Sequence, residues 1–235
     1  MKLVILAGGY GTRLAEETKT IPKPLIKIGN KPIIWHIMKI YSHFGINNFI
    51  ICLGYKGKLL KDKLNHASKK ENWKIKYINT GLKTMTGGRI KRIQKYFLKN
   101  EIFCLTYGDG LCDVNIKKLI NFHKKKNKIA TLTAVKYRNP KGVLSFTDSF
   151  KIQKMKEKPV EYINGGFYVL SNKIFKYLKD DKSIFERECL TKLSKKNELI
   201  GFKHRGFWAC MDTMREKIAL NKVWKSSDRA WKVWK

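Results

Sequence analysis

The sequence predicts an α/β protein with a Rossmann-like, three-layer α/β/α fold, in which helices cover both faces of a mostly parallel sheet. Two observations carry this prediction. Short apolar runs rich in Ile, Val, Phe and Thr alternate with helical patterns through the first half of the chain, and a glycine-rich turn directly follows the first apolar run. Such alternation is typical of parallel sheets, whose ligands bind at the carboxyl ends of the strands.

The first half of the chain contains five predicted strands and three predicted helices. The strands are the apolar runs 2–7, 47–53, 74–79, 101–106 and 129–136. The first helix spans 32–44, with Pro32 near its first turn and Gly45 at its end. The others span 87–98 and 114–126, and Asp113 is the predicted N-cap of the latter.

The regular alternation of strands and helices ends after about residue 138, although no linker, repeat or low-complexity tract interrupts the chain. A hairpin is predicted over 142–155, turning near 147–149, and a strand over 162–170. Helices are predicted over 172–179, 183–196 and 213–225. We therefore expect a single domain, 1–235, whose two halves, 1–137 and 138–235, are built on the same sheet.

The length and composition indicate a globular domain of ordinary size. The 235 residues are 43% hydrophobic and 12% aromatic, which is ample for a core. No run of 18 apolar residues occurs and the opening strand does not resemble a signal peptide, so a cytoplasmic location without membrane contact is expected. The five cysteines show no C-x-x-C pair and are expected to be reduced and mostly buried.

The formal net charge of +33 raises the question of nucleic-acid binding. Only eight of the 51 basic residues are Arg, and the lysines are spread along the whole chain. Nucleic-acid readers concentrate charge on one face and interleave exposed aromatic residues. The sequence favours a compositional bias over a specific nucleic-acid partner, although the field still attracts polyanions such as nucleotides.

The glycine-rich turn reads LAGGYGTRL, and three glycines in four positions free the backbone to approach a phosphate chain: Gly8, Gly9 and Gly11. Arg13 adds a forked cation beside them. The turn is not a dinucleotide fingerprint, because Leu14 stands at the third glycine position, and no Gly-Lys-Ser/Thr of a Walker A loop follows. The pattern favours a loop that binds a nucleoside triphosphate, and a purely structural turn is the alternative.

Three charged residues extend this hypothesis. Lys23 stands between two prolines, which fix its backbone and suit it to a triphosphate; a solvated loop lysine is the alternative. Asp109, between two glycines at a strand end, is a candidate Mg²⁺ ligand. Because Mg²⁺ usually takes one or two protein carboxylates, Asp212 is the candidate second ligand, and an ordinary helix N-cap is its alternative.

Three weaker motifs follow. Glu157 and Lys158 precede a proline, a pairing that suits a phosphorylated polyol but is common in loops. Asn164 and Gly165 offer an amide and close backbone approach. The run TMTGGR, which includes Thr86, could read a base or sugar edge at a helix start, bind an anion there, or simply cap that helix. The five histidines show no metal spacing with cysteine.

Together these motifs resemble the sugar-phosphate nucleotidyltransferase superfamily and, within it, the bacterial glucose-1-phosphate cytidylyltransferases. The resemblance runs nearly end to end. The glycine loop, PKP and EKP are typical of the superfamily, whereas IIWHIMKIYSHFGI, TMTGGR and the terminal WKVW are more particular to the cytidylyl branch. The implied fold is that of the nucleotidyltransferases, with a sugar-binding lobe on the same sheet. It implies a nucleotide-binding half, 1–137, and a sugar-phosphate-binding half, 138–235.

The resemblance also implies site residues and partners. The partners are CTP and a sugar 1-phosphate, and the cofactor is Mg²⁺. The implied CTP-binding residues are Leu6, Ala7, Gly8, Gly9, Gly11, Thr12, Arg13, Lys23, Thr86, Gly87 and Gly88. The implied sugar-phosphate residues are Gly142, Glu157, Lys158, Asn164 and Gly165. Asp109 and Asp212 would bind the metal, and the implied catalytic residues are Arg13, Lys23, Asp109, Lys158 and Asp212.

The implied reaction transfers a cytidylyl group from CTP to glucose 1-phosphate and gives CDP-glucose, for deoxysugar and surface-polysaccharide synthesis, and pyrophosphate. Another sugar 1-phosphate or nucleoside triphosphate is one alternative, and a non-catalytic nucleotide- or polyanion-binding protein is another. The chain departs from the family between Gly57 and Tyr77, where it is shorter by about twenty residues, and at 138–142. The apolar tail 231–234 is expected to dock either on a second copy in a homo-oligomer or on its own body.

Overall fold

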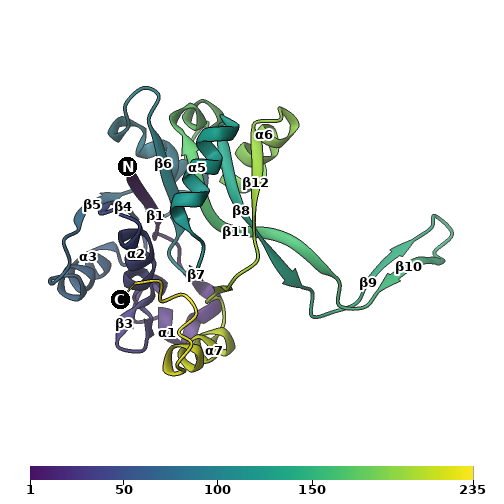
Figure 1. Cartoon of the computed structure of the whole chain (residues 1–235), viewed down its shortest axis with the longest axis horizontal. Helices are drawn as coiled ribbons and strands as arrows, with labels where there is room; N and C mark the ends of the chain where they lie inside the picture. Colours follow the sequence, from purple (N-terminus) through teal and green to yellow (C-terminus); the bar gives the residue numbers. More distant parts are fainter. Residues whose placement is uncertain (235) are drawn as a thin grey trace.

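The computed structural model describes residues 1–234, and its centre is a seven-stranded sheet (Figure 1). In spatial order the strands are β12 (Leu199–His204), β8 (Ala130–Arg138), β11 (Val160–Ser171), β6 (Ile102–Tyr107), β1 (Lys2–Leu6), β4 (Asn48–Leu53) and β5 (Lys74–Asn79). Strand β11 runs antiparallel to both its neighbours, and every other pairing in this sheet is parallel. The predicted α/β class with a mostly parallel sheet is therefore confirmed; position 235 of the predicted domain lies outside the described residues.

Alternate side chains of the central strands enter two separate cores. In β1, Leu3 and Ile5 belong to one core, and Val4 and Leu6 belong to the other. All but Leu6 are fully buried, because a parallel sheet covered on both faces hides the side chains of both sides. The apolar run that predicted this strand is therefore continuous, because its side chains pack into the cores on both faces of the sheet.

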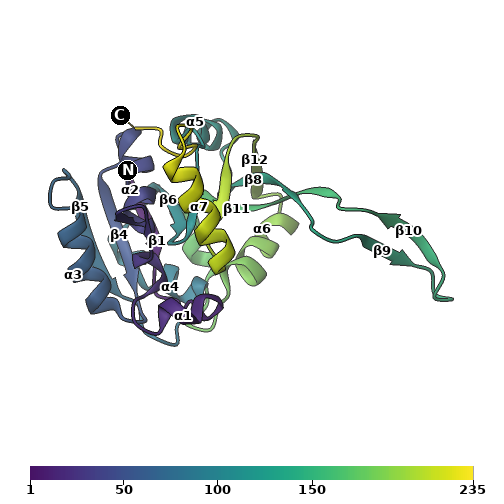
Figure 2. The ribbon, with the colours of Figure 1, turned by 90° about the horizontal axis from the view of Figure 1, so that it is seen from below.

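Helices form the two outer layers. The helices that pack on the first core are α2 (Ile33–His43), α3 (Gly57–Ala67), α5 (Ile116–Lys126) and α7 (Met214–Lys225). Those on the second core are α4 (Thr86–Arg92), a 3-10 helix (Asn172–Tyr177), a π-helix (Phe185–Leu190) and α6 (Thr191–Lys195). Figure 2 shows helices on both sides of the sheet, as the three-layer prediction requires.

The predicted N-cap of α5 is wrong. The helix begins at Ile116, and the Asn115 side chain accepts a hydrogen bond from the Lys118 backbone N–H at 2.9 Å. Asp113 instead accepts from the His204 ring. Both Asp and Asn are good N-caps, so the local sequence does not distinguish Asp113 from Asn115. Asp113 is instead paired with His204, which is distant in the sequence.

Other elements differ from the prediction in extent. The helix expected over 87–98 is α4, which ends at Arg92, followed by a 3-10 helix (Gln94–Tyr96). No helix was predicted for α3 and no strand for β12. Three short strand pairings complete the fold: β2 (Lys27–Ile28) with β3 (Lys31–Pro32), β7 (Gly110–Cys112) with β13 (Trp208–Cys210), and β9 (Val143–Phe146) with β10 (Ile152–Lys156).

The predicted hairpin 142–155 is present as β9 and β10, but it forms a separate two-stranded ribbon. Figures 1 and 2 both show this ribbon projecting away from the rest of the molecule. All residues of its two strands are exposed, including Phe146 and Ile152. The ribbon therefore adds nothing to either core.

The C-terminal tail docks on its own body. Trp231 is fully buried and stacks on Trp224 of α7, with ring centroids 5.6 Å apart. Its indole N–H donates to His36 of α2 at 3.4 Å. Of the two expectations for this tail, the structure shows the intramolecular one.

The remaining general expectations concern thiols and membranes. All five cysteines are free, four of them are buried, and Cys210 is half-buried, as expected. Among the described residues, no helix combines the length and apolar character needed to cross a membrane.

Candidate functional site

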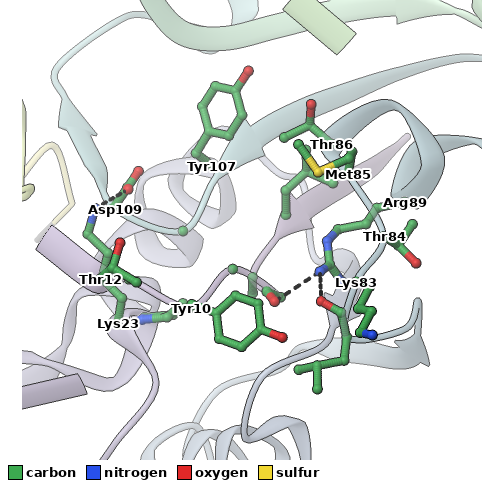
Figure 3. A pocket seen from close by; sticks show the side chains of 18 of the residues that line it. Tyr10, Thr12, Lys23, Lys83, Thr84, Met85, Thr86, Arg89, Tyr107 and Asp109 are labelled. Atoms are coloured by element: carbon green, nitrogen blue, oxygen red, sulfur yellow. Dashed lines mark hydrogen bonds and ion pairs between the residues drawn. The ribbon is translucent and has the colours of Figure 1, made fainter. Parts of the chain in front are cut away.

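A cavity of about 420 Å³ opens at the carboxyl ends of β1 and β6 (Figure 3). This is the sheet edge at which ligands of doubly wound folds bind. Four segments line it: the glycine loop 6–13, Lys23 with Pro24, the stretch 82–86 with Arg89, and residues 107–109. The predicted nucleotide-binding residues Leu6 to Gly9, Gly11 to Arg13, Lys23 and Thr86 all line this one cavity.

Each of the three glycines in the loop is explained by a different structural reason. A Cβ on Gly8 would lie 2.1 Å from an Arg89 nitrogen and 2.9 Å from the Gly54 backbone nitrogen, so packing excludes a side chain there. Gly11 has φ of +69°, the left-handed region that favours glycine. A Cβ on Gly9 would meet no described atom within 4 Å. Gly9 therefore leaves its backbone open to the cavity, as a phosphate-binding loop needs.

Arg89 holds the glycine loop against the ends of β4 and β5. Its guanidinium donates to the carbonyl oxygens of Gly8, Leu53 and Gly81 at 3.0, 3.1 and 2.8 Å, and to the Thr80 hydroxyl at 2.7 Å. Burial lowers the pKa of Arg89 below its ordinary value. The TMTGGR motif contains this residue, but sequence reasoning assigned it no role, since its partners come from distant loops.

Lys23 lies at the centre of a four-charge cluster. Its ammonium donates to Asp109 Oδ2 at 2.5 Å and to Asp212 Oδ1 at 2.6 Å. Arg13 donates to the other oxygen of Asp212 at 2.7 Å. These four residues come from the glycine loop, the 3-10 helix Lys23–Leu25, the end of β6 and the start of α7. The structure thus brings together four of the five predicted catalytic residues.

The cluster shifts the pKa values of two of its members, Lys23 and Asp212. Burial acts to lower the pKa of Lys23, but the two carboxylates outweigh it, so the pKa lies above its ordinary value. Burial acts to raise the pKa of Asp212, and the Lys23 and Arg13 charges outweigh it in the opposite direction. Both shifts favour the charged forms of Lys23 and Asp212, so the ion pair between them is present at neutral pH.

The donor set of this cluster suits a hard divalent cation. One oxygen each of Asp109 and Asp212, with the Cys210 sulfur, lies within 4.8 Å of the others. Burial raises the pKa of Cys210, which keeps that thiol neutral and unsuited to Mg²⁺. Two converging carboxylates that already share the Lys23 ammonium fit the oxygen ligands that Mg²⁺ prefers.

A second, smaller cavity of about 200 Å³ adjoins the first and shares Tyr107 and Asp109 with it. Asp212 and the predicted residues Asn164 and Gly165 line this second cavity. The carbonyl of Gly165 accepts a hydrogen bond from the Trp208 indole at 2.7 Å. Asp109 and Asp212 thus border the space beside the glycine-loop cavity.

The structure does not bring the other predicted sugar-phosphate residues to these cavities. Gly142, Glu157 and Lys158 lie at the base of the projecting ribbon and line neither cavity. The side chains of Glu157 and Lys158 are 63% and 58% exposed, and their charged groups are 3.9 Å apart. A Cβ on Gly142 would lie 3.0 Å from Glu157, so the three residues are neighbours. Their role stays a prediction.

Gly87 and Gly88 also line neither cavity. A Cβ on Gly87 would lie 2.7 Å from the Ser183 carbonyl oxygen, and one on Gly88 would lie 2.6 Å from the Asp181 Cα. These glycines therefore allow close packing of α4 on the loop 180–183. Their predicted contact with CTP is not tested by this packing.

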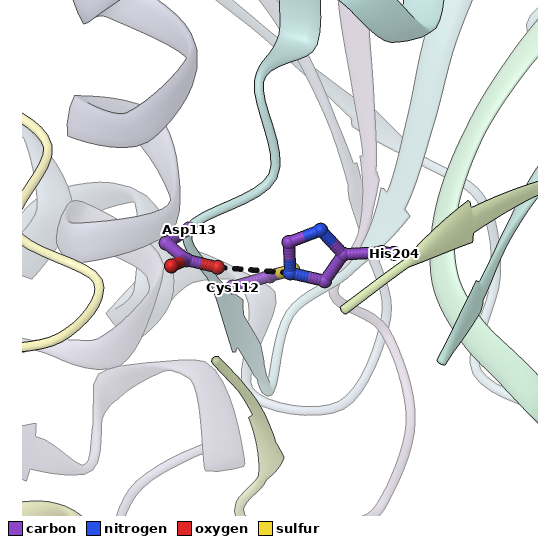
Figure 4. A group of neighbouring side chains, drawn as sticks. All are labelled: Cys112, Asp113 and His204. Atoms are coloured by element: carbon purple, nitrogen blue, oxygen red, sulfur yellow. Dashed lines mark hydrogen bonds and ion pairs between the residues drawn. The ribbon is translucent and has the colours of Figure 1, made fainter. Parts of the chain in front are cut away.

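A second group of metal-capable side chains comprises Cys112, Asp113 and His204 (Figure 4). His204 and Asp113 are hydrogen-bonded at 2.8 Å, which joins the end of β12 to the segment after β7. Burial raises the pKa of the Cys112 thiol. A neutral thiol beside a satisfied His–Asp pair favours a structural lock between the two segments over a metal site.

Known proteins resemble this chain over nearly its whole length. The family model described as nucleotidyl transferase matches residues 2–221. The glucose-1-phosphate cytidylyltransferase of Salmonella typhi is 42% identical over 257 aligned positions, with both chains covered completely. A probable glucose-1-phosphate cytidylyltransferase of Bacillus subtilis is 42% identical over 255 positions, again with full coverage. The crystal structure of HddC from Yersinia pseudotuberculosis is similar in fold, with a TM-score of 0.78, 28% identity, and coverage of 95% of this chain and 99% of that one.

Proposed function

Because the chain belongs to the nucleotidyl transferase family, we propose that it transfers a cytidylyl group from CTP to glucose 1-phosphate, with release of CDP-glucose and pyrophosphate. The choice of substrates rests on the full-length similarity to relatives that carry this activity in their names. One observation in the structure supports it most: Lys23, Asp109 and Asp212 converge where the glycine-loop cavity adjoins the second cavity.

The reaction requires no nucleophile from the protein. A phosphate oxygen of the sugar phosphate forms a bond to the α-phosphorus of CTP, and the bond from that phosphorus to the β-phosphate oxygen breaks. Pyrophosphate leaves with the electron pair. The protein positions the two substrates and stabilises negative charge on the phosphates, which are the main routes to catalysis in phosphoryl transfer.

The residues of the first cavity bind the nucleotide in this proposal. Backbone N–H groups of the glycine loop hold the triphosphate, with Arg13 beside them, and Thr86 lies at the base and ribose end. Lys23 orients Asp109 and Asp212 through its two hydrogen bonds and supplies positive charge near the phosphates. Arg89 keeps the loop in place from behind.

Asp109 and Asp212 would hold a Mg²⁺ ion. When bound, such an ion offsets the charge that develops on the transferring phosphoryl group.

Asn164 and Gly165 would contact the sugar phosphate in the second cavity, while Gly142, Glu157 and Lys158 would contribute from the ribbon. This assigns the nucleotide mainly to 1–137 and the acceptor mainly to 138–235. Asp109 belongs to the first half and Asp212 to the second, so the two halves meet at the reacting atoms.

The test is turnover by the purified chain with Mg²⁺. Four nucleoside triphosphates are assayed against several sugar 1-phosphates by pyrophosphate release, and CTP with glucose 1-phosphate should give the highest kcat/KM. A different preferred pair would replace the substrates but keep the reaction. Tight nucleotide binding with no turnover on any pair would favour the non-catalytic alternative.

A further inference from the structure

A chain of hydrogen bonds runs behind the wall that the two cavities share. Glu186, on the π-helix Phe185–Leu190, accepts from the Thr86 hydroxyl at 2.9 Å and from the Tyr107 hydroxyl. The Tyr107 oxygen is 3.1 Å from the Tyr168 hydroxyl, and the Asn164 amide donates to Tyr168 at 2.5 Å. In Figure 3 the hydroxyls of Thr86 and Tyr107 point to the same side of the cavity.

Irregular backbone segments position the side chains of this hydrogen-bond chain. A π-helix, which is rare and common at functional sites, presents Glu186. The pairing of β11 with β8 is irregular between Asn164 and Tyr168, and bulges recur beside active sites. Gly166, with φ of +79°, leaves room for the Tyr107 ring, which would lie 2.9 Å from a Cβ there. Three unusual backbone conformations in one place indicate that the fold holds these side chains in a defined arrangement.

The carboxylate fixes the direction of every hydrogen bond in the chain. An ionised carboxyl group only accepts, so Thr86 and Tyr107 must both donate their single hydroxyl hydrogen to Glu186. Tyr168 must then donate to Tyr107, and the Asn164 amide donates to Tyr168.

The consequence for the first cavity concerns Thr86. Its hydrogen is committed to Glu186, and its oxygen also accepts from the Phe185 backbone N–H at 3.0 Å. What remains for a ligand is one acceptor position on that oxygen. Thr86 lies at the end of the cavity away from Lys23 and Asp109, as Figure 3 shows, so a nucleotide whose phosphates are near Lys23 places its base towards Thr86.

We infer that Glu186 is a positioning residue that holds Thr86 as a hydrogen-bond acceptor and thereby selects, among pyrimidine nucleotides, a base with an amino group over one with a carbonyl. Cytosine donates from its N4 amino group, whereas uracil presents an oxygen there. An oxygen facing a fixed acceptor leaves both desolvated and unpaired, which is the basis of strong discrimination. The inference rests on the proposed nucleotide function and names the group that sets its base preference.

The test compares CTP and UTP binding by calorimetry in the wild type and in Glu186→Gln, with Mg²⁺. The Gln amide can donate to Thr86, which frees the Thr86 hydroxyl to donate to a carbonyl. We expect the ratio of the UTP to the CTP dissociation constants to fall at least tenfold. The matched control is Glu188→Gln on the same helix, whose carboxylate accepts from the Ile184 backbone N–H at 3.2 Å; this variant should keep the wild-type ratio.

Two variants at the cavity wall keep the test independent of the stability of Glu186→Gln. Thr86→Ser retains the hydroxyl and should retain the ratio, whereas Thr86→Val should lower it as much as Glu186→Gln does. The double variant Thr86→Val with Glu186→Gln should show no further change, since both act through one oxygen. A merely structural Glu186 would weaken both nucleotides equally.

The outcomes separate this inference from the proposed function. A wild type that prefers CTP, with an unchanged ratio in Glu186→Gln or in Thr86→Val, overturns the role of Glu186 and leaves the cytidylyl transfer intact. A folded wild type that binds CTP and UTP equally, or binds neither, overturns the role of Glu186, and the turnover assay with four nucleoside triphosphates then decides the proposed function separately.

Discussion

Lys23 shows how one side chain can organise a site of mixed charge. Two carboxylates as close as those of Asp109 and Asp212 repel each other unless a cation lies between them. The Lys23 ammonium supplies that cation, and the prolines on both sides of it hold its backbone. The lysine therefore contributes to the shape of the site before any ligand binds.

Replacing Lys23 by Met should lower turnover by about 10²–10³-fold, the usual cost of removing one hydrogen-bond donor that stabilises the charge of a transition state. The variant removes the charge but keeps most of the side-chain volume. Pyrophosphate release measures the effect, and Lys27→Met, which changes an exposed lysine on β2, is the control. Near-normal turnover in Lys23→Met would show that the phosphates are bound elsewhere.

His36 links residue chemistry to stability. It is fully buried against Trp224 and Trp231, and burial lowers its pKa to about 4. The folded protein therefore binds the proton more weakly than the unfolded chain, for which the ordinary value is 6.5. Stability from this group is complete above pH 6.5 and is lost as the pH falls towards 4, by about 3 kcal/mol at most.

Urea unfolding at pH 7 and at pH 4.5 checks this expectation. His36→Gln should lose stability at pH 7 but show a smaller decrease between the two pH values than the wild type. His123, whose pKa burial also lowers to about 4, contributes a similar decrease to both proteins and does not alter the comparison. Equal decreases in the two proteins would contradict the assignment to His36.

The sequence predicted residues that carry a local signal and missed those that act over distance. Gly11, Lys23 and Asp109 stand in recognisable local patterns, and all three line the main cavity. Glu186 has no such pattern, since its partners Thr86 and Tyr107 are 100 and 79 positions away. Only the folded chain reveals what that carboxylate contacts.

Among the helices and strands, those with a continuous apolar pattern and with Pro or Gly at their ends were predicted well from the sequence. Helix α2 starts after Pro32 and ends before Gly45, as expected from both residues. Helix α3 was missed because only Leu60 and Leu64 of its eleven residues are buried, among many lysines. Strand β12 was missed because its residues are half-buried or exposed, which weakens the apolar signal at a sheet edge.

The ribbon β9–β10 is the element whose removal should separate stability from turnover. Replacing residues 142–158 by a short Gly-Ser linker should leave the melting temperature within a few degrees, since neither of its strands is buried. CTP binding should persist, whereas turnover should be lost with Glu157 and Lys158.

Differential scanning fluorimetry, calorimetry with CTP and pyrophosphate release measure these three properties. The control is Phe150→Ser at the ribbon tip, a residue that is 89% exposed, which should change none of them. Full turnover without the ribbon would remove Gly142, Glu157 and Lys158 from the acceptor site.

Over the whole molecule, the net charge of +33 should accelerate the encounter with anionic substrates. The cluster of Arg13, Lys23, Asp109 and Asp212 is itself balanced, so this attraction comes from the surrounding lysines. Such long-range attraction is screened by salt, because the Debye length falls from about 30 Å at 0.01 M to about 8 Å at 0.15 M.

The KM for CTP should therefore rise several-fold between 0.02 M and 0.3 M KCl. Inhibition by uncharged cytidine, which the field does not attract, should change little over the same range. A KM that does not depend on salt would show that the lysine-rich surface has no part in substrate capture.

The burial of Trp231 also governs how a newly made polypeptide matures. Every residue assigned to the two cavities has been synthesised by position 212, yet the indole that covers His36 and Trp224 leaves the ribosome later. A chain that ends just before Trp231 leaves His36 and Trp224 without this cover, and exposed apolar surface promotes association with other unfinished chains. A nonsense mutation a few codons upstream of Trp231 would spare all the proposed chemistry and still be removed by quality control.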